Sequence, residues 1–353
     1  MEIREKILKF SIKNKKFTTK NMVEEFGISR QHIHRHLKKI VEHGEIIKIG
    51  HTSHSFYIHK DNIKKIKDFA DEKYEHVYES KNLEEHHVLT KIEKNFPFIH
   101  FLPENIKSIF DFAFSEMLNN AIEHSHTKLI HIKITKKYNK INFIISDSGI
   151  GVFRSILEKK NLKTELEAIQ ELLKGKTTTM PRSHSGEGIF FTSKSVDLFI
   201  LESFKKRLII DSNIQDVFIE DQKETKRGTR VICEISLSSK KHLSDIFRKY
   251  TNLTEESDHG FDKTEILIKL YNMSGIHVSR SQARRIISGL EKFSIVVFDY
   301  DKVPTIGQAF ADEIYRVFHN KYPKIKIENK NMNENVEFMV KRAINEAKKE
   351  LNN

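Results

Sequence analysis

The sequence predicts a multidomain protein of α+β and α/β class, and three observations support this. The first 60 residues combine short amphipathic helices with two strand-like runs and carry 13 Lys and Arg against six Asp and Glu. A central helix with acid and amide side chains on one face precedes two glycine motifs. Strands and helices alternate after residue 262, which indicates a small α/β layer domain. The expected segments are an N-terminal domain 1–60, a helical connector 61–95, a central domain 96–240, a linker 241–262 and a C-terminal domain 263–353.

Composition limits the kind of protein this is. At 353 residues the chain is long enough for two or three domains. No apolar run reaches the roughly 20 residues that span a bilayer, and the N-terminus lacks the apolar stretch of a secretory signal. The single cysteine, Cys233, excludes an intrachain disulfide and a cysteine zinc cage. We therefore expect a cytoplasmic protein with no membrane association.

The N-terminal domain is expected to hold three helices and a strand pair. Thr18 or Thr19 is the predicted N-cap of the second helix, Gly27 makes the turn after it, and Ser29 caps the third. Two short strands then pair around a turn. In order, the expected elements are a helix over 3–12, a short helix ending at 26, a helix from 30 to about 43, and strands 44–50 and 55–58 joined by a turn at 51–54.

This arrangement resembles a winged helix-turn-helix domain over residues 1–60. The resemblance implies that the third helix enters the major groove of double-stranded DNA. The residues expected to contact DNA are Arg30, Gln31, His34, Arg35 and Lys38. A winged helix used only for protein contacts is the alternative, and the basic charge favours DNA. His32 and His36 have the spacing of a metal-binding pair, but no carboxylate or thiol completes a ligand set.

The central domain is expected to begin with a long helix over 104–124, followed by strands 129–134 and 141–145. One face of this helix is polar because its acid and amide residues are spaced i, i+3, i+4, i+7. The opposite face is apolar and should pack on a core. The polar face holds Glu116, Asn119, Asn120 and Glu123, and the apolar face holds Phe110, Phe114, Met117, Leu118 and Ala121. A metal-bound nucleotide is the occupant that suits the polar face best.

Three motifs in this order resemble the GHKL ATP-binding fold of gyrases, heat-shock chaperones, histidine kinases and anti-sigma-factor serine kinases. They are Ser115–His124, Asp147–Gly151 and Ser185–Ile189. The first is most similar to the anti-sigma-factor kinases, which have a Glu four residues before an Asn-Ala pair. The resemblance implies a central α/β sandwich. A two-component histidine kinase is not expected, because Glu84–His87 lacks the Arg/Pro pattern that follows a phosphoacceptor histidine.

The resemblance also implies roles for individual residues. Glu116 would be the general base, and Asn120 would offer an amide oxygen to Mg²⁺ that bridges the phosphates. Asp147 would accept the adenine amino hydrogen and so select ATP. The other residues implied at the nucleotide are Asn119, Glu123, Gly149, Gly151, Lys176, Gly186, Gly188 and Thr229. A degenerate domain that binds ATP without turnover is the alternative, and the presence of Glu116 argues against it.

The C-terminal domain resembles STAS domains, the fold of anti-sigma-factor antagonists. The run Ile306–Ile314 is similar to an uncharacterised STAS-like family that is often fused to GHKL domains. STAS antagonists carry a phosphorylatable serine at this place, and here Thr305 is the possible phosphoacceptor. Ser279 or Ser281 is expected to cap a helix over 282–292. The nearby arginines, Arg280, Arg284 and Arg285, are alternatively an anion site.

Together these features predict a DNA-binding transcriptional regulator controlled by binding and hydrolysis of Mg-ATP. The alternative is a serine/threonine protein kinase of the anti-sigma-factor type that acts on Thr305 or on a partner STAS antagonist. A third possibility is a scaffold with a structural nucleotide. A homodimer and a sigma-factor-type protein partner are compatible with all three.

Overall fold

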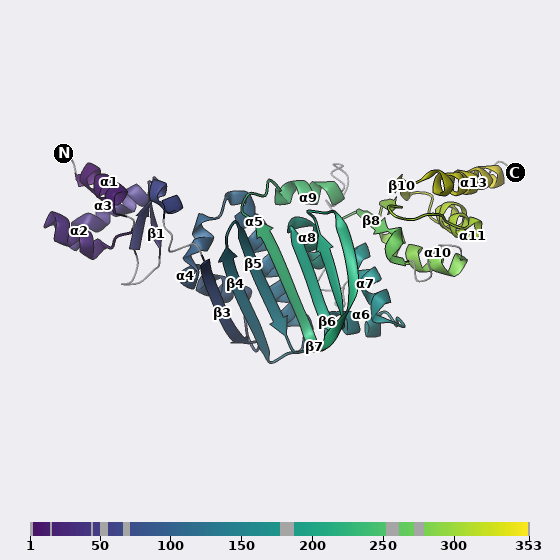
Figure 1. Ribbon diagram of the computed structural model, residues 1–353, viewed down its shortest axis with the longest axis horizontal. Helices are drawn as coiled ribbons and strands as arrows, with labels where there is room; N and C mark the ends of the chain where they lie inside the picture. Colours follow the sequence, from purple (N-terminus) through teal and green to yellow (C-terminus); the bar gives the residue numbers. More distant parts are fainter. Residues whose placement is uncertain are drawn as a thin grey trace.

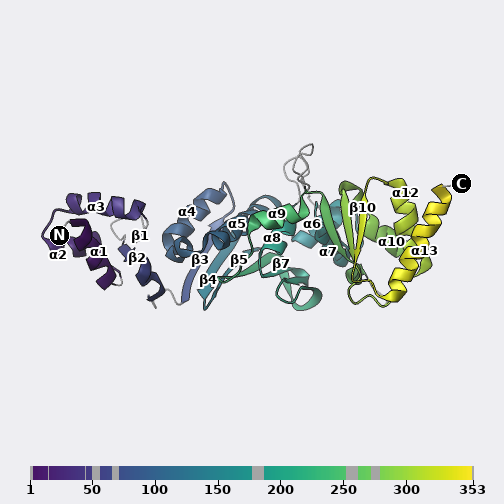
Figure 2. The same cartoon turned by 90° about the horizontal axis from the view of Figure 1, so that it is seen from above.

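The computed structural model describes residues 3–14, 16–43, 45–49, 56–65, 71–176, 187–251, 261–271 and 279–351. Three bodies lie in a row, with the two chain ends at opposite ends of the molecule (Figure 1). The view from above shows the same order, with the central sheet between the N-terminal helices and the smaller C-terminal domain (Figure 2). None of the helices in the described ranges is long and apolar enough to cross a membrane.

The N-terminal region contains the expected helices and strands. They are α1 (Ile3–Lys13), α2 (Thr19–Phe26), α3 (Arg30–Glu42), β1 (Ile46–Ile49) and β2 (Phe56–His59), the strands being antiparallel. Thr18 rather than Thr19 caps α2, through a capping box with Asn21, and Gly27 ends the helix in the left-handed conformation. The Ser29 hydroxyl accepts the amide hydrogen of His32, which confirms the predicted cap of α3. The predicted turn at 51–54 lies outside the described residues.

The central domain is a five-stranded antiparallel sheet with helices on one face (Figure 1). The strand order is β3-β4-β5-β7-β6. The strands are β3 (Asp71–Glu79), β4 (Leu129–Lys137), β5 (Lys140–Asp147), β6 (Leu198–Asp211) and β7 (Asp216–Ser236). The helices are α4 (Glu85–Asn95), α5 (Glu104–His124), α6 (Val152–Lys159), α7 (Glu165–Lys174), α8 (Gly188–Ser195) and α9 (Leu243–Tyr250).

Two segments differ from the prediction. The helical connector expected over 61–95 contains β3, an edge strand of the central sheet. Tyr74 and Tyr78 face the core at 6% and 8% exposure, His76 between them is half-buried, and the odd positions from 73 to 79 are exposed, a period of two that suits a strand better than a helix. The linker expected over 241–262 contains α9, whose Phe247 packs edge-on against Phe112 of α5 at 5.2 Å between ring centres. Both segments therefore belong to the packed structure.

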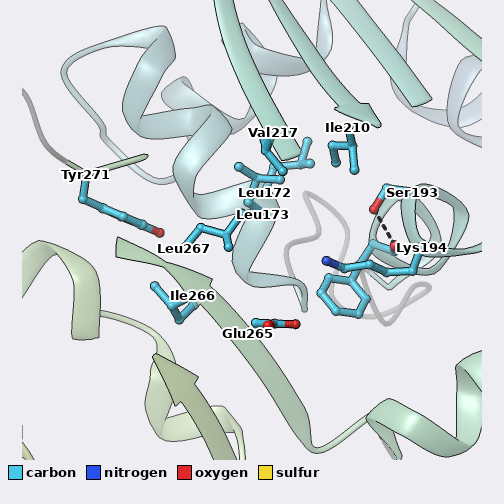
Figure 3. A pocket seen from close by; sticks show the side chains of 11 residues that line it. Leu172, Leu173, Ser193, Lys194, Ile210, Val217, Glu265, Ile266, Leu267 and Tyr271 are labelled. Atoms are coloured by element: carbon cyan, nitrogen blue, oxygen red, sulfur yellow. Dashed lines mark hydrogen bonds between the residues drawn. The ribbon is translucent and has the colours of Figure 1, made fainter. Parts of the chain in front are cut away.

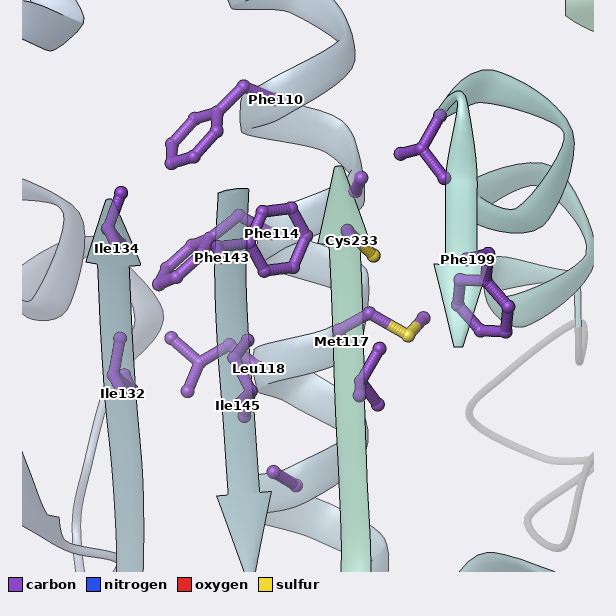
Figure 4. Close-up of a cluster of buried hydrophobic side chains, with 14 of the residues drawn as sticks. Phe110, Phe114, Met117, Leu118, Ile132, Ile134, Phe143, Ile145, Phe199 and Cys233 are labelled. Carbon is purple, nitrogen blue, oxygen red and sulfur yellow. The ribbon is translucent and has the colours of Figure 1, made fainter. Parts of the chain in front are cut away.

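The apolar face of α5 packs on the sheet as predicted. Phe110, Phe114, Met117 and Leu118 are at most 1% exposed. They meet inward-facing side chains of four strands, among them Ile132, Ile134, Phe143, Ile145, Phe199 and Cys233 (Figure 4). Burying a side chain of this size stabilises the fold by about 1.5–3 kcal/mol, so this contact fixes how α5 is rotated over the sheet. The polar face of α5 is consequently turned away from the core.

The C-terminal domain has a three-stranded parallel sheet, in the order β10-β9-β8, with helices around it. Ser279 caps α10 through a capping box with Gln282, which confirms the cap. Arg280 and Arg284 pair with Asp312 and Glu313, so these arginines hold a neighbouring helix rather than an anion site. The elements are β8 (Lys263–Leu267), α10 (Arg280–Ile287), β9 (Ile295–Asp299), α11 (Gln308–Asp312), a π-helical turn (Glu313–Phe318), α12 (His319–Lys321), β10 (Lys326–Lys330) and α13 (Glu334–Leu351).

Helix α7 connects the central and C-terminal domains. The Lys174 side chain, 3% exposed, donates to the carbonyl oxygens of Arg285 and Ser288 at 3.0 and 2.8 Å and pairs with Glu171 on its own helix. The Thr264 hydroxyl returns a hydrogen bond to the Lys174 carbonyl at 2.6 Å. These buried bonds place the C-terminal domain directly against the helix layer of the central domain.

Candidate nucleotide site

Asp147 ends strand β5 in a buried position, at 5% exposure. Its Oδ1 accepts the amide hydrogens of Gly149 and Thr229, at 2.8 and 3.2 Å. Within the described ranges no group donates to Oδ2. Burial raises the pKa of this carboxyl above the ordinary value, although the two amides and the Lys226 ammonium act in the opposite direction. In the described part of the chain the second carboxylate oxygen is therefore available to accept a hydrogen bond from a ligand.

Two glycines allow the backbone to pack closely near this carboxylate. A Cβ on Gly228, at φ +77°, would lie 2.6 Å from Asp147 Oδ1 and 2.5 Å from the Asp147 carbonyl oxygen. On Gly149 it would lie 1.8 Å from the carbonyl oxygen of Ser125, at the end of α5. A side chain at Gly228 would therefore push its loop away from Asp147, and one at Gly149 would push the loop after Asp147 away from the end of α5.

Thr229 and Lys226 hold the loop from the far side. The Thr229 hydroxyl accepts the amide hydrogen of Val152, the first residue of α6, at 3.0 Å. Lys226 donates to the carbonyl oxygen of Asp147 at 2.6 Å. Sequence reasoning identified Thr229 but missed Lys226, because one lysine in a charged hairpin gives no local signal. Only the strand pairing that follows Gly228 could have placed it near Asp147.

Glu116 faces the start of α8. Gly188 is the first residue of that helix, and a Cβ there would lie 2.0 Å from Glu116 Oε2. Asn120 follows one turn later on α5 and is half-buried. The predicted base, the predicted magnesium ligand and the donor-rich first turn of α8 thus lie together. This arrangement can hold a phosphate chain beside a carboxylate.

Four predicted residues have other placements. The Asn119 amide donates to Glu85 of α4 at 2.8 Å, which makes it a packing contact rather than a nucleotide contact. Lys176 donates to the carbonyl oxygen of Lys292 at 2.9 Å, so the structure places it on the C-terminal domain and not toward a phosphate. Glu123 is exposed in the last turn of α5. Gly186 lies outside the described residues.

Gly151 supports the loop rather than lining it. At φ +83°, a Cβ there would lie 2.5 Å from Ser203 Oγ and 2.6 Å from the ring of Phe204, which sits at a bulge in β6. The Ser203 hydroxyl in turn donates to the Gly228 carbonyl at 2.8 Å. The glycine thus lets the start of α6 lie close to the sheet beneath Asp147.

Replacing Gly188 with Ala is expected to lower ATP turnover at least tenfold, because the new methyl group would displace the Glu116 carboxylate. Steady-state release of phosphate measures this. Gly27→Ala is the matched control: it also replaces a glycine, one at positive φ, but a Cβ there has no atom within 4 Å. Turnover by Gly188→Ala equal to that of Gly27→Ala would contradict the placement of Glu116.

Comparison with known families agrees with this geometry. Residues 107–239 match the family described as "Histidine kinase-, DNA gyrase B-, and HSP90-like ATPase". Residues 282–337 match the "STAS-like domain of unknown function (DUF4325)". No curated protein sequence matches the chain. The protein therefore contains a GHKL-type ATPase domain, which implies ATP binding, usually with Mg²⁺, and a STAS-like domain.

Proposed function

We propose that this protein is an ATP-responsive DNA-binding regulator. Its GHKL-type domain would bind and hydrolyse Mg-ATP, its N-terminal domain would bind double-stranded DNA, and its STAS-like domain would sense or transmit the nucleotide state. The family match supports the ATPase part, and the basic N-terminal residues support DNA as the partner.

The unused oxygen of Asp147 is the observation that best supports ATP as the ligand. An adenine amino group would donate to Oδ2, whereas the 6-oxo group of guanine would face it with a second acceptor. Asn120 offers an amide oxygen to Mg²⁺, a hard cation that would neutralise phosphate charge. Glu116 would accept a proton from the attacking water. Under this proposal the chain supplies a contact that selects adenine, a ligand for Mg²⁺ and a general base.

Helix α3 supports the DNA-binding role. Arg30, Gln31, His34, Arg35 and Lys38 are all exposed. In the described part of the chain, none of the three basic side chains among them forms an ion pair with a carboxylate, so their charge is available to phosphates. The Ser29 cap fixes the start of α3, and the apolar face of α3 packs in the core of the N-terminal domain, so these side chains lie on the outer face of the helix. The arrangement suits a recognition helix.

The position of Thr305 supports a protein kinase as the second candidate function. It is partly exposed in the loop before α11, two residues ahead of the Gly307 N-cap. A hydroxyl near a helix start is accessible to a phosphate donor in trans. Phosphorylation there would place negative charge at the favourable end of α11 and the helical turns that continue it.

Following the γ-phosphate of labelled ATP tests the proposal. We expect free phosphate from the wild-type protein, and at least 100-fold less from Glu116→Gln and Asn120→Ala. Retention of a random duplex DNA library should differ between ATP and ADP, and Arg30→Ala with Arg35→Ala should weaken it. Label that stays on the protein and disappears in Thr305→Ala would instead establish the kinase. Failure to bind any nucleotide would overturn the proposal.

A further inference from the structure

A cluster of aromatic rings joins the ATPase domain to the STAS-like domain. We call it the aromatic junction. It takes rings from α5, α8 and α9 of one domain and from two loops of the other. Its members are Phe112, Phe190, Phe191, Phe247, Tyr250, Phe261 and Phe293. Phe190, Phe191 and Phe261 are at most 3% exposed and share one buried cluster with the core residues of the STAS-like domain.

Phe261 stands at the centre of the aromatic junction. Its ring centre lies 4.5 Å from that of Phe190, 5.0 Å from Phe191 and 5.3 Å from Phe293. It also closes on the end of α7, since a Cβ on Gly175 would lie 2.5 Å from the Phe261 ring. One side chain of the STAS-like domain therefore contacts both α8 and the C-terminal cap of α7.

The aromatic junction lies next to the predicted catalytic group. Phe112 is one helical turn before Glu116 on α5, and residues four apart share a face. Phe190 is two residues after Gly188, whose backbone touches the Glu116 carboxylate. A shift of α8 by a fraction of an ångström would change the contact between Gly188 and Glu116 directly. Helix α5, which carries Glu116, and helix α8, which lies against it, therefore both contribute a ring to the aromatic junction.

The C-terminal end of α8 faces the STAS-like domain. Lys194 lines a pocket between the two domains, with Glu265 of β8 on the other side (Figure 3). Its ammonium is 5.5 Å from the Phe190 ring centre and 6.0 Å from that of Tyr250. Helix α8 therefore meets the STAS-like domain through Phe190 and Phe191 and, near its C-terminal end, across the pocket that Lys194 and Glu265 line.

We propose that Phe261 is a positioning residue for ATP hydrolysis: it seats α8 so that Gly188 holds the Glu116 carboxylate in place. This proposal rests on the proposed ATPase function and adds the regulation of its site. A change in the packing of the STAS-like domain would alter the rate of the chemical step while leaving the adenine contact at Asp147 intact. The STAS-like domain thus acts as a control element of the ATPase in the same chain.

The test compares two Phe-to-Leu substitutions in the 353-residue chain. Phe261→Leu removes the central ring of the aromatic junction. Phe298→Leu, on β9, removes an equally buried ring of the same domain whose neighbour is Tyr315. We expect Phe261→Leu to lower kcat about tenfold, with KM and the Kd for ATP within about twofold of wild type. Phe298→Leu should leave kcat within about twofold even if it lowers the melting temperature equally.

Hydrogen exchange of the α8 amides gives a second measurement that does not depend on ATP turnover. Phe261→Leu should raise exchange in α8 and Phe298→Leu should not. Equal kcat and equal α8 exchange in the two variants would overturn the positioning role. If the wild-type protein bound no ATP, the proposed function would fail, and exchange alone would still decide whether Phe261 seats α8.

Discussion

Replacing Asp147 with Asn is expected to weaken ATP binding about 100-fold while the protein stays folded. The amide oxygen of Asn can still accept from Gly149 and Thr229, so the loop keeps its shape. The amide nitrogen would then meet the adenine amino group, donor against donor. Losing a hydrogen bond to a charged acceptor in a buried site costs about 2–3 kcal/mol, which matches this change in affinity. Titration calorimetry with ATP measures it.

A matched control separates this loss from misfolding. Asp197→Asn changes another buried aspartate of the same domain, one that pairs with Lys241 at 3.2 Å. It should reduce stability but leave ATP affinity within about threefold, because the contact is remote from the Asp147 loop. An Asp147→Asn protein that binds ATP as tightly as wild type would remove the base contact from the proposed site.

The same carboxyl gives a pH dependence of definite sign. Because burial raises its pKa in the folded state, the folded protein binds this proton more tightly than the unfolded chain does. The contribution of Asp147 to the free energy of unfolding therefore rises as the pH falls through the raised pKa toward the ordinary one. The affinity for ATP should fall as the pH falls over the same range, because the protonated carboxyl would donate a hydrogen bond where the adenine amino group needs an acceptor. Asp147→Asn should lack both effects.

Replacing Lys174 with Met is expected to lower the free energy of unfolding by about 3 kcal/mol. Methionine fills similar space, but it removes the ammonium that donates to the carbonyl oxygens of Arg285 and Ser288. Glu171 would keep its pair with Lys160, at 2.8 Å. The lost bonds join α7 to the STAS-like domain, so the two domains should separate before either unfolds. Urea unfolding followed by fluorescence from a probe in each domain measures this.

Lys160→Met is the control for the second prediction. Lys160 pairs with the same Glu171 carboxylate, but its side chain is 28% exposed. Within the described ranges it forms no hydrogen bond or ion pair with the STAS-like domain. We expect a loss below about 1 kcal/mol, with the two domains still unfolding together. Equal losses from the two substitutions would show that the interface bonds of Lys174 contribute little.

Local signals in the sequence predicted the elements that carry strong patterns. The period of α5, the caps at Ser29 and Ser279 and the glycine motif after Asp147 all have direct counterparts in the structure. Each depends on neighbours within a few positions along the chain. Such features can be predicted because the physical cause and the residue lie in the same segment.

The missed features depend on contacts between distant segments. Strand β3 was expected to be helical because its charged residues hide a short alternation of tyrosines, and pairing with β4 decides its state. Lys176 was expected at a phosphate, but its partner is a carbonyl oxygen more than 100 positions away in the chain. Phenylalanines of the aromatic junction carry no local mark at all. Tertiary packing, absent from any short window, determines all three.

The place of β3 also limits how such proteins can be assembled from interchangeable parts. The strand pairs with β4 along its whole length, from Asp71 opposite Lys137 to Glu79 opposite Leu129. If the N-terminal domain were exchanged at residue 95, β3 would be lost with it. The edge of β4 would then be unpaired and could pair with another chain and promote aggregation. An exchange just before Asp71 would keep the sheet whole. A fusion that joins a different N-terminal domain to this ATPase domain and keeps the sheet whole must therefore join ahead of β3, well upstream of residue 107, where the ATPase family match begins.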